Sequence, residues 1–70
     1  MDDLNKMVRR HLSALTKAKK VGPAEVIAVC DIAFEDFDEF GWPDNWHTFN
    51  IARNDAEMEI ARNNWSNRWI

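Results

Sequence analysis

The side chains best suited to catalysis or to binding a soft metal ion are two histidines and one cysteine, His11, Cys30 and His47. A nucleophile with its base, or a ligand set for zinc, needs such residues at a characteristic spacing. No two of these three have that spacing, and the two glycines of the chain are too few for a phosphate-binding loop. The sequence therefore predicts no metal site, no cofactor and no enzymatic activity.

Each of these residues also has a structural explanation. Cys30 falls inside an apolar stripe, where a free cysteine behaves as a small core residue. His11 borders another apolar stripe, and His47 lies in the first turn of a predicted helix. The acid pairs, such as Glu35 with Asp38, lie on an open helix face that offers no cleft for acid–base chemistry.

The composition indicates one small helical domain over residues 1–70, with 65–70 as a tail. The 70 residues are 46% hydrophobic and 30% charged, which is too apolar for a disordered chain. No apolar run approaches the roughly 20 residues that a membrane-spanning helix needs, so we expect no membrane partner. The acidic start Met1-Asp2-Asp3 is unlike a signal peptide, and we expect the chain to be cytoplasmic.

Apolar residues recur at helical spacing in three segments, which predicts helices over about 3–20, 23–40 and 43–64. Val21-Gly22-Pro23 and Gly41-Trp42-Pro43 separate them, because glycine commonly follows a helix and proline commonly begins one. The expected fold is an all-α, small three-helix bundle.

Charge is divided unevenly among the three segments. Residues 1–22 carry a net charge of +4, residues 23–41 carry −6 and residues 42–70 carry −1. The opposite charges of the first two helices could favour one bundle topology, or they could bind other molecules. The first helix has a basic stripe, formed by Lys6, Arg9, Arg10, Lys17 and Lys20. The second helix ends in an acidic cluster, formed by Glu35, Asp36, Asp38 and Glu39.

The third helix has two apolar faces, of which a bundle needs only one. The predicted inner face consists of Trp46, Phe49, Ala52, Ala56 and Ile60. The predicted outer face consists of Ile51, Met58, Ala61, Trp65 and Trp69. We expect Trp42 and Trp46 to seal the end of the bundle together with Phe40 and Phe49. The outer face needs cover from the tail folding back or from another chain, which could be a second copy.

Within residues 34–56, the run Phe-Glu-Asp-Phe-Asp-Glu-Phe-Gly-Trp-Pro-Asp-Asn-Trp and the run Ile-Ala-Arg-Asn-Asp-Ala resemble short accessory proteins of tailed bacteriophages. The resemblance implies a small phage accessory protein that binds a host protein and blocks or redirects it. It implies no catalytic residue.

These observations predict a non-enzymatic protein–protein interaction module, a phage-encoded inhibitor or modulator of a host nucleic-acid enzyme or defence complex. The partner-binding residues are expected to be Glu35, Asp36, Asp38, Glu39, Ile51, Met58, Trp65 and Trp69. One alternative is a nucleic-acid accessory protein that binds through the basic stripe. Another is a structural homo-oligomer, with a homodimer formed through the outer face.

Overall fold

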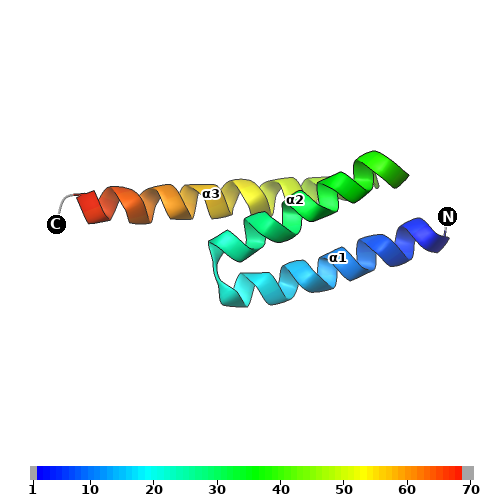
Figure 1. The fold of residues 1–70 in the computed structure, drawn as a ribbon, viewed down its shortest axis with the longest axis horizontal. Coiled ribbons are helices and arrows are strands. Elements are labelled where there is room, and N and C mark those ends of the chain that lie inside the picture. Colours follow the sequence, from blue (N-terminus) through cyan, green and yellow to red (C-terminus); the bar gives the residue numbers. More distant parts are fainter. Residues whose placement is uncertain (1, 69–70) are drawn as a thin grey trace.

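The computed structural model describes the backbone of residues 2–68 and the side chains of residues 3–64. It contains the helices α1 (Asp2–Val21), α2 (Pro23–Phe40) and α3 (Trp46–Arg68), shown in Figure 1. This confirms the prediction of an all-α, three-helix fold, and the described part of the chain contains no strand.

The start of α3 lies three residues later than predicted. Asp44 and Asn45 form a turn in which the backbone N–H of Trp46 donates to the carbonyl of Pro43 at 3.2 Å. The N–H of Thr48 then donates to the carbonyl of Asn45 at 3.1 Å, so regular helix begins only after the turn. At its other end α3 continues to Arg68, through most of the segment predicted as a tail.

The turn between α2 and α3 depends on a glycine. Gly41 has a φ of +125°, a conformation that residues with a Cβ rarely adopt. Its N–H donates to the carbonyl of Phe37 at 2.8 Å and so satisfies one of the free carbonyls at the end of α2. The other connection, at Gly22-Pro23, leaves one fewer free N–H at the start of α2, because the proline at the first turn has none.

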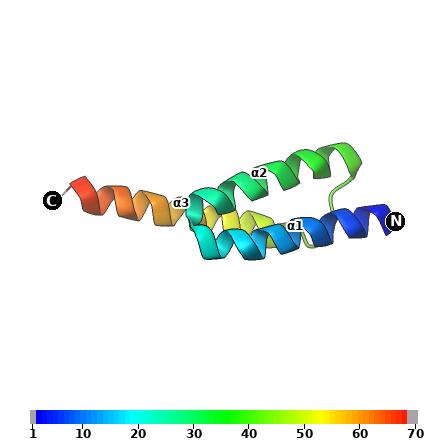
Figure 2. The ribbon, with the colours of Figure 1, turned by 60° about the horizontal axis from the view of Figure 1, so that its bottom comes forward.

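The three helices are not equally packed. α2 packs against both α1 and α3, whereas α1 and α3 barely contact each other. Figure 1 and Figure 2 show that α3 continues beyond the α1–α2 turn, so its C-terminal half projects from the rest of the molecule. The molecule is accordingly elongated, with extents of 51 × 19 × 15 Å.

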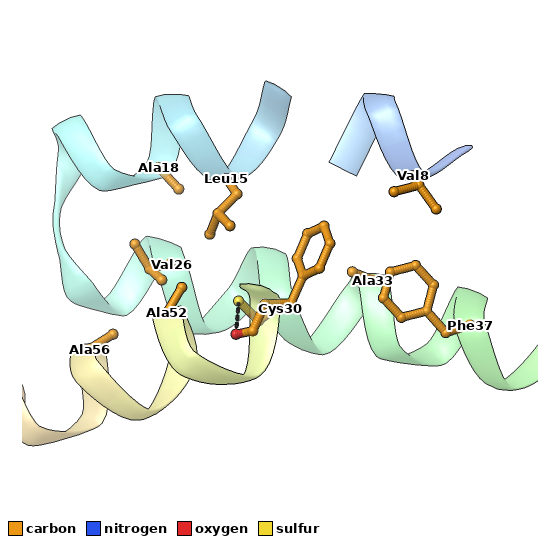
Figure 3. Close-up of a cluster of buried hydrophobic side chains, with 10 residues drawn as sticks. Val8, Leu15, Ala18, Val26, Cys30, Ala33, Phe37, Ala52 and Ala56 are labelled. Carbon is orange, nitrogen blue, oxygen red and sulfur yellow. Dashed lines mark hydrogen bonds between the residues drawn. The ribbon is translucent and has the colours of Figure 1, made fainter. Parts of the chain in front are cut away.

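All three helices contribute to one hydrophobic core (Figure 3). Its buried residues are Val8, Leu15, Ala18, Val26, Cys30, Ala33, Phe37, Phe49, Ala52 and Ala56. The prediction that Cys30 is a core residue is confirmed, since its side chain is fully buried. No described helix is long and apolar enough to cross a membrane.

Candidate interaction surfaces

An aromatic cluster joins the C-terminal end of α2 to the start of α3. Phe37 lies at its centre, with ring centroids at 5.4 Å from Phe49, 5.5 Å from Trp42 and 6.2 Å from Phe34. The ring of His11 packs edge-on against Phe37 from α1, at 6.1 Å. This cluster ties all three helices together at one end of the molecule.

The prediction that four aromatic residues seal this end is only partly confirmed. Phe49 is fully buried and Trp46 packs against the core. The prediction for Phe40 is wrong, because Phe40 is the last residue of α2 and is 65% exposed. Trp42 lies between these cases: one face stacks on Phe34 at 5.5 Å while 47% of the residue remains exposed.

Two members of the acidic cluster bind other side chains within the fold. The carboxylate of Asp36 lies 2.7 Å from Nε2 of His11, which links α2 to α1. Asp38 accepts a hydrogen bond from the indole N–H of Trp42 at 2.9 Å. These bonds offset the unfavourable interaction of acids with the C-terminal end of a helix.

Glu35 and Glu39, by contrast, are exposed, and neither is hydrogen-bonded to a described side chain. The cluster is therefore divided between two carboxylates that help to build the fold and two that face solvent. The bond between His11 and Asp36 was not predicted from the sequence. The signal was available, because both residues border the apolar stripes of their helices.

All five members of the basic stripe are exposed on α1. In the described part of the chain, none of them forms an ion pair with a carboxylate. The only ion pair between α1 and α2 among the described residues is that of His11 with Asp36. Lys6 and Arg10 line a groove together with Asp36 of α2 but form no ion pair with it. Direct ion pairs thus do not account for the opposite charges of the two helices.

The outer face of α3 is uncovered where its side chains are described. Ile51 is 60% exposed and Met58 is 62% exposed, and Ala61 is also exposed. The inner face is the one that packs, with Phe49, Ala52 and Ala56 buried, as the sequence predicted. The side chain of Trp65, and Trp69 as a whole, lie outside the described residues.

Arg53 connects α3 to α2 and was not singled out in the sequence. Its Nε donates to Asp31 at 2.8 Å and its Nη1 donates to Glu57 at 2.5 Å. The hydrogen bond with Asp31 is the main reason why the pKa of Arg53 is raised above its usual value. The two bonds orient Arg53 along the seam between the helices.

The environment of Cys30 makes it a poor nucleophile. Its thiol donates to the carbonyl of Phe49 at 3.3 Å (Figure 3). Burial, with a smaller contribution from Asp31, raises the pKa of Cys30, so the thiolate is disfavoured at neutral pH. No group of three or more metal-ligating side chains occurs among the residues that the structure describes.

A groove of about 400 Å³ lies between the α1–α2 turn and α3, and we call it the turn groove. The buried residues Val26, Ala52 and Ala56 contribute its apolar lining. Asp55 and Glu59 of α3 are exposed at the same groove, next to the outer face. The groove thus presents two carboxylates and the exposed Lys19 beside an apolar surface.

Comparison of this chain with protein-family models, with curated proteins and with solved structures finds no match. The resemblance to phage accessory proteins therefore stays a prediction. The assignment of function rests on the surfaces described above.

Proposed function

We propose that this chain is a non-enzymatic protein–protein interaction module that binds its partner through the outer face of α3. The observation that supports this proposal is the exposure of Ile51 and Met58, each by 60% or more, on a helix whose other face already completes the core. Single exposed apolar residues are common on proteins, but aligned ones on a projecting helix are typical of an interface. Beyond this part of the helix, α3 projects past the α1–α2 turn (Figure 1).

The narrower form of the proposal is a phage-encoded inhibitor or modulator of a host nucleic-acid enzyme or defence complex, acting in the host cytoplasm. Its support is the resemblance of residues 34–56 to phage accessory proteins, together with the acidic end of α2. Glu35 and Glu39 are the carboxylates available there to meet a basic groove on such an enzyme. Asp36 and Asp38 contribute charge while they hold the fold together.

The test is affinity capture of the tagged protein from a bacterial lysate, with mass spectrometry of what is retained. A variant with Ile51→Ser and Met58→Ser should lose the captured protein. Ile32→Ser is the matched control, because Ile32 is 56% exposed but lies on α2. Equal recovery with all three proteins would refute the outer face as the binding surface.

A second candidate function is supported by the basic stripe. Five exposed cations without an ion pair in the described part of the chain could bind a nucleic-acid backbone. Five phosphate contacts on duplex DNA would make the logarithm of the affinity fall with the logarithm of salt concentration with a slope of about −4 to −5. No binding to duplex or single-stranded DNA at low salt would eliminate this candidate.

A further inference from the structure

The exposed residues of the outer face follow the spacing of a coiled-coil seam. Ile51, Asn54, Met58 and Ala61 are separated by three, four and three residues, and all four are exposed. This alternation keeps one line of side chains facing a neighbouring helix. The seam contains apolar residues at three of the four positions and an amide at the other, so it suits a second helix with a similar seam.

One flank of this seam carries two opposite charges. Asp55 and Arg62 are seven residues apart, so they lie on the same side of α3, about two turns from each other. Both are exposed, and neither is hydrogen-bonded to a described side chain. Glu57 lies on the other flank and already accepts a hydrogen bond from Arg53.

We propose that the outer face is covered by a second copy of this chain, whose α3 packs antiparallel to the first. This inference rests on the proposed interaction function and takes a second copy, in place of a host protein, as the partner of the outer face. With Met58 opposite Ala61 of the second copy, Asp55 lies beside Arg62 of the second copy. The two-fold axis repeats both contacts, so the charges on the flank are complementary at two places.

The charges favour this direction over a parallel pair. In a parallel pair the two flanks face each other, which sets Arg62 against Glu57 of the second copy and Asp55 against the neutral Asn50. Glu57 is already engaged with Arg53, whereas Asp55 is free of such a bond. Glu59 lies beside Asp55 at the turn groove, where Lys19 of α1 offsets one of these two negative charges.

The shape of the molecule also suits an antiparallel pair. The outer face is roughly opposite the side of α3 that packs on α2. Ile51 also lines the turn groove with Gly22 and Pro23, so the second copy would pack along α3 beside the α1–α2 turn. Residues 51–68 of one α3 would lie along residues 68–51 of the other, an overlap of about 27 Å. The projecting C-terminal half of each α3 would then pack against the N-terminal half of the other α3. That N-terminal half is already held in place by the α2 of its own chain.

The experiment reverses one charge at a time and measures mass by sedimentation equilibrium. The native chain of 8.2 kDa should form a species of twice that mass at high concentration. Asp55→Arg and Arg62→Asp each oppose like charges at both contacts, so each variant alone should dimerise about tenfold more weakly. Asp44→Arg is the matched control, because Asp44 is exposed in the turn before α3, and it should dimerise like the native chain.

The decisive measurement is the mixture of the two variants. A chain with Asp55→Arg offers two positive charges and a chain with Arg62→Asp offers two negative ones, so the mixed pair regains attraction at both contacts. Recovery of native dimer strength in the mixture supports the antiparallel second copy. Circular dichroism of each variant should match that of the native chain, because both positions are exposed.

A native chain that stays at 8.2 kDa at every concentration would overturn the inference, as would a mixture no stronger than its components. These results leave the proposed function intact if a foreign protein is still captured through Ile51 and Met58. Conversely, the native chain could dimerise and the mixture of variants regain native dimer strength while no foreign protein is captured. That result would support the second copy and refute binding of a host protein through this face.

Discussion

The substitution Phe37→Ala tests whether the aromatic cluster holds the three helices together. Phe37 is fully buried, and its ring packs against one aromatic ring from α1 and one from each of α2, the turn and α3. Alanine would leave a cavity where α1, α2 and α3 meet. The stability of the whole fold should therefore respond, rather than that of one helix.

The magnitude follows from the burial of the side chain. Replacing a fully buried phenylalanine with alanine costs about 3–5 kcal/mol of unfolding free energy. A core of about 70 residues rarely supplies more than about 3–5 kcal/mol in total. The substitution should therefore remove nearly all of the stability and leave a large fraction of the chain unfolded.

Urea titration followed by far-ultraviolet circular dichroism measures this loss. The matched control is Phe40→Ala, because Phe40 lies one turn further along α2 and is 65% exposed. We expect the control to change the unfolding free energy by less than about 1 kcal/mol. The reasoning is refuted if Phe37→Ala keeps a cooperative transition within about 1 kcal/mol of the control.

Three further predictions concern the turn, the link between α1 and α2, and the thiol. Gly41→Ala should lower the unfolding free energy by about 1–2 kcal/mol in the same titration, because alanine is strained at a φ of +125°. An added Cβ would have no atom within 4 Å, so a steric clash does not contribute. An unchanged midpoint would contradict this. Asp36→Ala should lower the unfolding free energy by about 0.5–1.5 kcal/mol, because it removes the bond to His11. Glu35→Ala should have almost no effect, because Glu35 is exposed. Equal losses of stability in the two variants would argue against the bond. Because burial raises the pKa of Cys30, the unfolded thiol loses its proton at lower pH than the folded one, so stability should fall as pH rises through about 9.0. Cys30→Ala should lack that component in urea titrations at several pH values, and an identical pH dependence would exclude it.

Much of the architecture followed from local patterns in the sequence. The helical spacing of apolar residues predicted three helices and placed Cys30 in the core. It also separated the buried inner face of α3 from the exposed outer face at Ile51 and Met58. These predictions succeed because the 3.6-residue period is a property of the helix itself and needs no knowledge of its neighbours.

The roles of individual polar and aromatic residues depended on tertiary structure. Asp36 and Asp38 look equivalent to Glu35 and Glu39 in the sequence, but only the first two bind other described side chains. A carboxylate becomes structural when packing brings a donor within about 3 Å of it, and the donors here come from α1 and from the turn.

The placement of whole surfaces was decided in the same way. Sequence alone separated the two apolar faces of α3, whereas tertiary structure decided that α3 projects beyond the other helices (Figure 2). The physical reason is that Ala56 is the last buried residue of α3 among those described, so the helix beyond it has no neighbouring helix to pack on. Periodicity determines the direction in which a side chain points, but only the packing of neighbouring helices determines what it meets.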